Sequence, residues 1–393
     1  MQKNWTSQKV QAEGFVAPGY EAVAEEFERN FSARGDVGAG FAANLQGHPV
    51  VDIWGGTAAP GKAWQQDTLM PVFSCTKGLV AACMLKLIEE GRLDLHAPVT
   101  RYWPEFGQNG KERVLMRHLL SHRAGLPGIF EPLTPADIPD WEKMERLLAA
   151  QPLAQDPNAF HAYHAITIGW LAGAVLRRID GRTLGKFFAD EFAAPLGLET
   201  WIGLPQSEEH RVGTLEIGPG FGPWDAGQTD WQKSDKVLKS VWGNPPLFPM
   251  EGDLAWNSRA YHAAEIGGAG AITTARSVAR YYACMAMGGE IDGVRVLKRE
   301  TIRLGRSELS RFLDPYIIER MAFGVMWAIQ TPQRRFGRPA DAFGHSGAGG
   351  SIHGAWPSHG VGFSYTMNQM RVDPEDARSR YLLERLEECV VAQ

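Results

Sequence analysis

A serine and a lysine three residues apart, Ser74 and Lys77, are the residues whose types and spacing most directly suggest chemistry. Residues i and i+3 of a helix share a face, so this hydroxyl and this amine can point into one cleft. A serine becomes a useful nucleophile beside a base, and a lysine partly removed from water can lose its proton and act as that base. Backbone N–H groups at a helix N-terminus suit a developing oxyanion. The pair indicates acyl transfer, while a helix N-cap for Ser74 and a solvated side chain for Lys77 stay open as structural alternatives.

The segment that follows Ser74 is expected to form the helix that this chemistry needs. Apolar residues recur on one face from Thr76 to Glu90, and Gly91 follows as a stop signal. An amphipathic helix is predicted over 20–33, and two strands over 38–45 and 49–54 with a hairpin turn between them. Further helices are predicted over 116–121, 141–150, 166–178 and 184–192.

Strand patterns return near the end of the chain, after an irregular stretch over 204–260 that is rich in glycine, proline and tryptophan. Strands are predicted over 324–330, 342–345, 351–356 and 361–367, and a last helix over 376–391. This order predicts a mixed α/β (α+β) fold. Residues 15–73 and 265–393 are expected to build one sheet domain from both chain ends, and residues 74–264 a mostly helical domain, with Ser74 at their junction.

Composition excludes several classes of protein. The chain has 393 residues, of which 44% are hydrophobic and 22% charged, a mixture typical of globular proteins. The net charge of −5, without blocks of like charge, argues against a nucleic-acid partner. The sequence has no apolar run of about 18 residues, so no membrane-spanning helix is predicted. Residues 1–10 lack the apolar stretch of a secretory signal. A soluble, cytoplasmic protein without a membrane partner is therefore expected. The cysteines, which are Cys75, Cys83, Cys284 and Cys389, form no C-x-x-C pair and are expected to be reduced.

Three segments in order carry a resemblance to a known family: Ser74-Cys75-Thr76-Lys77, residues 90–95 (EGRLDL) and residues 118–127 (HLLSHRAGLP). Together they resemble the serine β-lactamase and penicillin-binding-protein superfamily, and within it the class C β-lactamase branch and the family VIII carboxylesterases. The resemblance runs from about residue 20 to residue 390. It implies an antiparallel sheet flanked by helices, an inserted helical domain, and an active site between the two.

The second motif of that superfamily, Tyr-x-Asn, is similar to Tyr163-His164-Ala165. The resemblance implies that Tyr163 moves a proton among Ser74, Lys77 and the leaving group, and a phenolate beside a lysine ammonium would be a feasible base. A core tyrosine is the structural alternative. Ala165 stands where β-lactamases and DD-peptidases carry asparagine, and the missing amide weakens the lactam and peptide interpretations.

The third motif, a Lys-Thr-Gly triplet, resembles His345-Ser346-Gly347 in its H-x-G form. The resemblance implies an edge strand that lines the cleft, with the backbone N–H groups of Ala348 and Ser74 as the oxyanion hole. Gly347 would let a carbonyl substrate approach the backbone closely. Because His345 replaces a fixed positive charge, a carboxylate-bearing penicillin should dock less well. A structural strand histidine is the alternative for His345.

Competing sites are weaker. Residues 344–348 nearly match the G-x-S-x-G nucleophile elbow, which would make Ser346 the nucleophile, but the chain after Ser346 is short for the remaining triad. His118 and His122 have zinc-helix spacing with a leucine in place of the required glutamate, and His161 and His164 flank Tyr163, so structural roles are favoured. The run Gly267–Gly270 lacks a full G-x-G-x-x-G, which argues against a nucleotide. A pocket wall is the functional hypothesis for four tryptophans of the irregular stretch: Trp224, Trp231, Trp242 and Trp256.

The sequence thus predicts a serine hydrolase in which Ser74 attacks an ester carbonyl, and Lys77 and Tyr163 share the acid and base work. The resemblance implies small-molecule esters with short acyl chains as substrates, and neither a metal nor an organic cofactor. A class C type β-lactamase, a DD- or D-amino-acid peptidase, an acyltransferase of the same fold and a catalytically silent binding protein are the alternatives. No oligomeric state is predicted.

Overall fold

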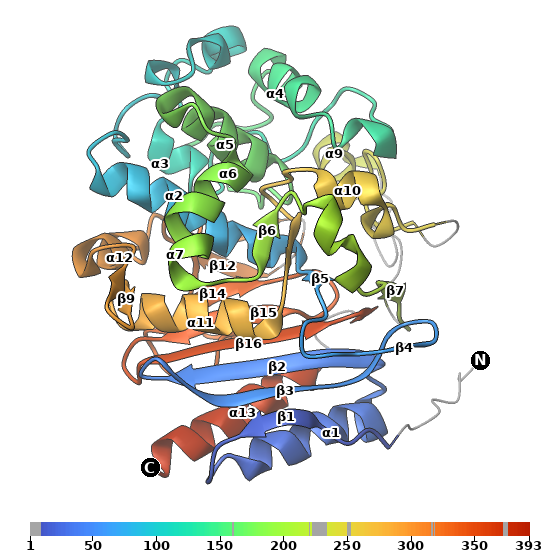
Figure 1. Cartoon of the computed structure of the whole chain (residues 1–393). Coiled ribbons are helices and arrows are strands. Elements are labelled where there is room, and N and C mark those ends of the chain that lie inside the picture. The colour runs from blue at the N-terminus through green and yellow to red at the C-terminus, as the bar shows by residue number, and fades with distance from the viewer. Residues whose placement is uncertain are drawn as a thin grey trace.

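The computed structural model describes residues 9–158, 161–219, 221, 234–249, 253–315, 317, 319–371 and 376–393. One antiparallel sheet runs through it in the order β1-β3-β2-β16-β15-β14-β13-β12-β11, with β4 paired to β3 (Figure 1). Its strands come from both ends of the chain: β1 (Glu13–Val16), β2 (Gly38–Leu45), β3 (His48–Ala59), β4 (Lys62–Ala63), β11 (Ser310–Leu313), β12 (Arg320–Phe323), β13 (Ala328–Ile329), β14 (Phe343–Ser346), β15 (Ile352–Trp356) and β16 (Val361–Met367). This confirms the predicted fold class, while the exact domain boundaries stay a prediction.

Helices cover both faces of the sheet (Figure 1). On one face α1 (Glu21–Arg34) and α13 (Arg378–Val391) pack together, and Phe27, Phe31 and Leu386 form a buried cluster with strand residues such as Phe41. On the other face α11 (Ala275–Ala286) packs against β16 and β2. Gly362 of β16 allows this contact, because a Cβ there would lie 2.0 Å from the backbone nitrogen of Ala283.

The helical part lies beyond α11, with α2 (Thr76–Glu89) at its centre (Figure 1). Nearly every side chain of α2 is buried, including Lys77, whereas the sequence pattern suggests a single apolar face. A helix buried on all sides is expected when neighbours surround it, and α2 contacts α5, α6, α12 and β14. The other helices are α3 (Met116–Leu119), α4 (Trp141–Ala150), α5 (Thr167–Asp180), α6 (Leu184–Phe188), α7 (Ala194–Leu196), α9 (Lys236–Trp242), α10 (Arg259–Ala263) and α12 (Arg299–Gly305).

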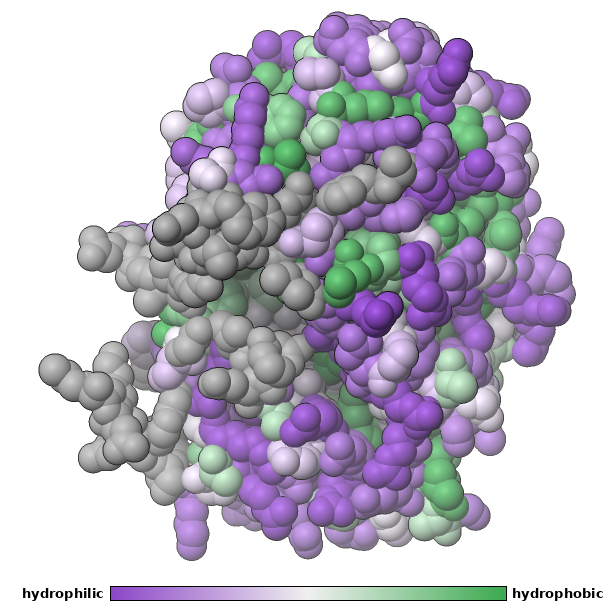
Figure 2. All heavy atoms as spheres, turned by 180° about the vertical axis from the view of Figure 1, so that it is seen from behind, coloured by the Kyte–Doolittle hydropathy of each residue, from purple (hydrophilic) through white to green (hydrophobic). Residues whose placement is uncertain are grey.

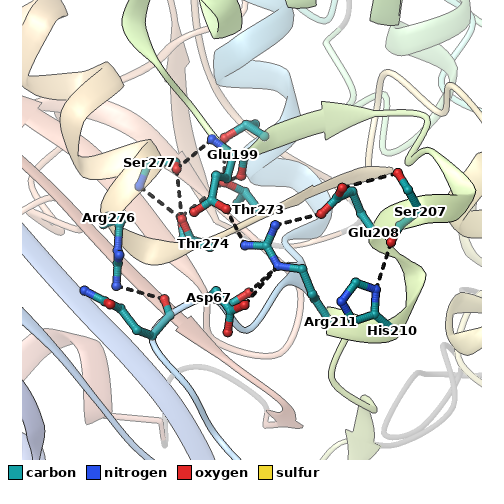
Figure 3. A network of polar contacts seen from close by, with 12 residues as sticks. Asp67, Glu199, Ser207, Glu208, His210, Arg211, Thr273, Thr274, Arg276 and Ser277 are labelled. Atoms are coloured by element: carbon teal, nitrogen blue, oxygen red, sulfur yellow. Dashed lines mark hydrogen bonds and ion pairs between the residues drawn. The ribbon is translucent and has the colours of Figure 1, made fainter.

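A second, small sheet leads the chain into the serine. It consists of β5 (Met70–Pro71), β8 (Ala271–Thr273) and β6 (Thr200–Ile202), with β8 in the middle. Arg211 ties the segments around this sheet together through ion pairs with Asp67, Glu199 and Glu208 (Figure 3). The Arg211 side chain is 12% exposed, but Asp67 and Glu199 are 59% and 38% exposed, so each ion pair contributes little by itself. Together the contacts connect the residues before β5 to those before β6.

Two predicted elements differ from the structure. The strand expected over 324–330 is divided, because Met326 has a φ of +58° and turns the chain between β12 and β13. The helix expected over 184–192 extends to Leu196, and a π-helical segment, Ala189–Ala193, separates α6 from α7. The strand expected over 49–54 is the first half of β3, which continues to Ala59. The ends of the other predicted helices and strands differ by at most two residues.

The surface seen from the back of the molecule is mostly hydrophilic, with hydrophobic residues in smaller areas between (Figure 2). The exposed large hydrophobic side chains of the described residues lie on four different elements: Phe15, Leu304, Leu313 and Val391. Among the described helices, none is long and apolar enough to cross a membrane.

Candidate active site

Ser74 lies in a tight turn, η1 (Phe73–Cys75), between β5 and α2. Phe73, the preceding residue, has a φ of +46°, a strained backbone conformation for a residue with a side chain. Thr76 holds the turn: its hydroxyl donates to the Phe73 carbonyl over 2.6 Å and accepts from the Ala271 N–H of β8 over 2.9 Å. The turn leaves Ser74 half-buried and facing a pocket.

Lys77 brings its amine to the serine. Its Nζ lies 3.0 Å from the Ser74 Oγ and 2.7 Å from each of two carbonyl oxygens, those of Ala165 and Gly268. The side chain is fully buried, and burial lowers its pKa well below the ordinary value of 10.5. A neutral amine has two N–H donors and one lone pair. When the amine is neutral, the two carbonyls can accept its two N–H groups, which leaves its lone pair for the Ser74 hydroxyl proton.

Glycines bring those two carbonyls together. The turn over 267–270 packs against the start of α5, where a Cβ on Gly169 would lie 2.0 Å from the Gly268 nitrogen. A Cβ on Gly268 would likewise lie 2.4 Å from the Ile166 carbonyl oxygen. The sequence did not indicate these two acceptors, because every residue carries a backbone carbonyl and no residue type marks the ones that meet Lys77. The glycine run was the available signal, and the structure gives it a role in holding Lys77.

Tyr163 lies just before α5, with its ring centroid 4.8 Å from the Lys77 Nζ. Its backbone N–H donates to Asp314 over 2.6 Å. Burial raises the pKa of Tyr163 above its ordinary value of 10.0, outweighing the opposite effect of the neighbouring Ser74 hydroxyl. The phenol therefore carries its proton near neutral pH. The expected phenolate is not favoured, because complete burial penalises the charged form.

His345 stands on β14 and is 3% exposed. Its Nδ1 lies 2.8 Å from the Ser346 carbonyl oxygen, which can only accept, so Nδ1 carries the proton and Nε2 the lone pair. Burial lowers the pKa of His345 to about 3, so the imidazole is neutral. The position that carries a lysine in the Lys-Thr-Gly motif thus has no positive charge.

Two backbone N–H groups are available beside the serine. A Cβ on Gly347 would lie 2.4 Å from the Val72 carbonyl oxygen, which shows how closely the end of β14 packs against the Ser74 turn. The Gly347 N–H is used by Ser351, at 2.7 Å. The N–H groups of Ser74 and Ala348 donate to no other backbone group in the described part of the chain, and both residues line the pocket. This is the arrangement expected of an oxyanion hole.

The pocket in front of Ser74 has a volume of about 210 Å³ and two unlike ends. At the apolar end Phe73 contacts Trp256 and Phe248 edge-on, with ring centroids 5.1 and 5.3 Å apart, and Trp242 and Leu247 complete the wall. The other end, on the side of β12 and β13, carries all of the charged side chains in the lining, among apolar ones such as Ile317, Met321 and Phe336; its polar and charged residues are Glu319, Arg320, Gln330, Thr331 and Arg335. The expected pocket wall includes Trp242 and Trp256, while Trp224 and Trp231 lie outside the described residues.

The surroundings of the alternative nucleophile, Ser346, and of the histidines with zinc-helix spacing do not favour those roles. Ser346 lines the pocket, but among the described residues its hydroxyl makes no hydrogen bond with a possible base. His122 and His118 each use Nδ1 to accept a backbone N–H, from His164 at 2.9 Å and from Leu115 at 3.3 Å. The His122 ring also packs 4.7 Å from Tyr163, a supporting contact that the sequence did not suggest. The rings of His161 and Phe312 stack at 5.0 Å.

Comparison with known proteins adds the family. The family profile described as Beta-lactamase matches residues 26–387, nearly the whole chain. The chain belongs to the beta-lactamase family. Within this family it is 33% identical to the esterase/beta-lactamase LipL of Mycobacterium tuberculosis, over 91% of this chain and 83% of the relative.

Solved structures of beta-lactamase-like proteins superimpose along the chain. One is a family VIII carboxylesterase, with a TM-score of 0.87 and 35% identity over 96% of this chain and 99% of the other. Another is a penicillin-binding-protein homologue from Caulobacter crescentus, with a TM-score of 0.88 and 34% identity over the same shares. These findings confirm the resemblance inferred from the motifs, while placement in the class C branch stays a prediction.

Proposed function

We propose that this protein is a serine carboxylesterase that hydrolyses small esters through an acyl-enzyme on Ser74. The observation that supports this most is the surroundings of the Lys77 amine, which is buried, held by two carbonyl oxygens and 3.0 Å from the Ser74 hydroxyl. A neutral amine so placed is a base aimed at one proton.

In the first half-reaction the Ser74 proton moves to the Lys77 Nζ as the Ser74 oxygen bonds to the ester carbonyl carbon. The carbonyl oxygen becomes an oxyanion, which the N–H groups of Ser74 and Ala348 stabilise. When this intermediate collapses, the bond to the alcohol oxygen breaks. Tyr163 gives its phenol proton to that oxygen and takes a proton back from Lys77, so the alcohol leaves neutral and the acyl group stays on Ser74.

The second half-reaction repeats these steps with water. The Lys77 amine takes a proton from the attacking water, a second oxyanion forms in the same hole, and the bond from Ser74 to the acyl carbon breaks. The proton that Lys77 took from the water moves to the Ser74 oxygen, which restores the neutral amine, and the carboxylic acid is released. An alcohol in place of water would give a new ester, which is the acyltransferase alternative.

Two residues favour an ester over a β-lactam drug. His345 is neutral, so it offers no cation to the carboxylate that penicillins carry. Ala165 provides a carbonyl to Lys77 but no side-chain amide to a substrate amide. Relatives named as esterases, LipL and the family VIII carboxylesterase, agree with this preference. A β-lactamase remains the second candidate, because the name of LipL includes both activities.

The test compares p-nitrophenyl acetate and butyrate with nitrocefin under identical conditions, using wild-type protein and Ser74→Ala. We expect kcat/KM to be higher for the esters, and turnover of each substrate to depend on Ser74. A preference for nitrocefin would make the β-lactamase the better description. Folded wild-type protein that turns over no ester, lactam or D-peptide would support a silent binding protein.

The proposal includes a small-molecule substrate, no nucleic-acid or membrane partner and a cytoplasmic location. The four cysteines support a reducing compartment, since all are buried free thiols. Burial raises the pKa of the Cys75 thiol, which lies beside Ser74 in sequence, so this thiol is a poor competing nucleophile.

A further inference from the structure

A second, smaller cavity lies behind the apolar end of the catalytic pocket. Its volume is about 20 Å³, enough for a water-sized group. Ile166 and Leu247 line both this cavity and the pocket that holds Ser74. Both side chains are 8% exposed. These two side chains are therefore the wall that the two spaces share.

The lining of the second cavity is partly polar, but its polar side chains already have hydrogen-bond partners. The Asn244 side chain donates to the carbonyls of Ile129 and Glu131 and accepts from the Leu133 N–H. The Thr167 hydroxyl donates to Leu126, and that of Ser240 to Val237. The rest of the lining includes Leu133, Ile138, Trp170 and Val241. An alkyl group that enters this space therefore leaves none of these three polar side chains without its partner.

The position of Tyr163 indicates which part of an ester reaches this wall. The Tyr163 ring lies 6.1 Å from that of Phe323 on β12, the strand that also carries Arg320 of the polar end. Because Tyr163 protonates the departing alcohol in the proposed mechanism, we assign the alcohol to the β12 side and the acyl group to the opposite side, past Phe73 and Trp256 toward Leu247.

We propose that Leu247 and Ile166 set the acyl-chain length of this enzyme by closing the catalytic pocket against the second cavity, an inference that rests on the proposed ester hydrolysis. A hydrogen bond fixes the backbone of this wall: the Trp256 indole N–H donates to the Leu247 carbonyl over 2.9 Å. An acyl chain that reaches Leu247 has no further room. Removing the Leu247 side chain joins the two spaces and lengthens the acyl site.

The experiment measures kcat/KM for two substrate series with wild type and Leu247→Ala. In the first, p-nitrophenyl esters carry acyl chains of increasing length; in the second, acetate esters carry alcohols of increasing length. We expect Leu247→Ala to gain about fourfold in kcat/KM for each added methylene that becomes buried, over roughly two methylenes. The alcohol series should keep its wild-type profile.

Leu133→Ala is the matched control. It removes the same side-chain carbons from the far wall of the second cavity, but Leu133 does not line the catalytic pocket. Its acyl profile should equal that of the wild type, so a lengthened profile there would show general loosening and overturn the proposal. Leu247→Val removes less of the same side chain and tests the wall if Leu247→Ala does not fold. It should shift the acyl-chain profile in the same direction by a smaller amount.

The remaining outcomes separate this inference from the proposed function. If esters are turned over with dependence on Ser74, but both Leu247 variants keep the wild-type acyl profile, the chain-length inference is wrong and the esterase stands. If Leu247→Ala changes the alcohol series instead, the assignment of the two pocket ends is reversed and the proposal fails. If no ester is turned over, the proposed function itself fails.

Discussion

One added methyl group, in Gly347→Ala, should disable the oxyanion hole while leaving the catalytic side chains intact. The new Cβ would lie 2.4 Å from the Val72 carbonyl oxygen, whereas Cβ atoms essentially never approach another atom within 3.0 Å. The end of β14 and the Ser74 turn must therefore separate by about 0.6 Å or more, which moves the two N–H donors apart. A donor at the ordinary 2.9 Å would then be about 3.5 Å from the oxyanion, beyond useful hydrogen-bond distance.

The expected cost follows from losing one donor of two. Removal of a single oxyanion-hole donor typically lowers kcat by about 10²- to 10³-fold, or about 2.7–4 kcal/mol. KM should change little, since the oxyanion exists only in the transition state and the intermediate. Overpacking should also reduce the free energy of unfolding by about 1–3 kcal/mol. The assay is steady-state hydrolysis of p-nitrophenyl butyrate, with thermal unfolding measured on the same samples.

Gly40→Ala is the control, because a Cβ there meets its nearest atoms at 3.4 Å or more, an ordinary contact, on a strand outside the pocket. It should keep wild-type kcat. A folded Gly347→Ala protein with kcat within about threefold of wild type would refute the reasoning. If Gly347→Ala does not fold, Ala348→Pro removes the N–H directly and Ala348→Gly retains it, so the first should lose activity and the second should not.

Four further predictions concern Lys77, Tyr163 and Ala165. Lys77 must be neutral to act as a base, so kcat/KM should fall as the pH decreases through its lowered pKa. His345, with a pKa of about 3, should add no inflection between pH 5 and 8. A kcat/KM that does not depend on pH would exclude Lys77 as the base. In the unfolded chain Lys77 keeps its proton up to about pH 10.4, whereas in the folded protein it loses the proton at a lower pH. The free energy of unfolding should therefore rise with pH between the lowered folded pKa and the unfolded pKa. Denaturant titrations at several pH values should show this rise in wild type and not in Lys77→Met. Tyr163→Phe should lower kcat by about 10²- to 10⁴-fold for alkyl esters and much less for p-nitrophenyl esters, whose leaving group needs no proton; equal losses would rule out proton donation. Ala165→Asn should raise nitrocefin turnover relative to p-nitrophenyl butyrate, and an unchanged ratio would show that the missing amide does not limit lactam hydrolysis.

The sequence identified the side chains of this site better than its backbone. The spacing of Ser74 and Lys77 predicted their contact, since three residues on a helix fix which groups share a face. The carbonyls of Ala165 and Gly268 could not be predicted in this way, because they reach Lys77 only after distant segments pack together.

Protonation states were also beyond the sequence pattern. The pKa of Tyr163 depends on complete burial, which follows from the surrounding fold, and burial favours the phenol over the expected phenolate. The same reason explains α2: periodicity indicated one apolar face, but contacts from several elements bury the helix all round. Likewise, the residue that turns the chain within the predicted strand over 324–330 is Met326. A methionine, unlike a glycine or an asparagine, is not a sequence signal for a positive φ.

The central claim is that Ser74 forms a covalent acyl-enzyme, and covalent labelling tests it most directly. Folded wild-type protein, Ser74→Ala and Ser346→Ala would be treated with an alkyl fluorophosphonate, and the adduct located by mass spectrometry of the intact chain and its peptides. We predict one adduct, on Ser74, in wild type and in Ser346→Ala, and none in Ser74→Ala. An adduct on Ser346, or an unlabelled Ser74 in protein that still hydrolyses esters, would contradict the account.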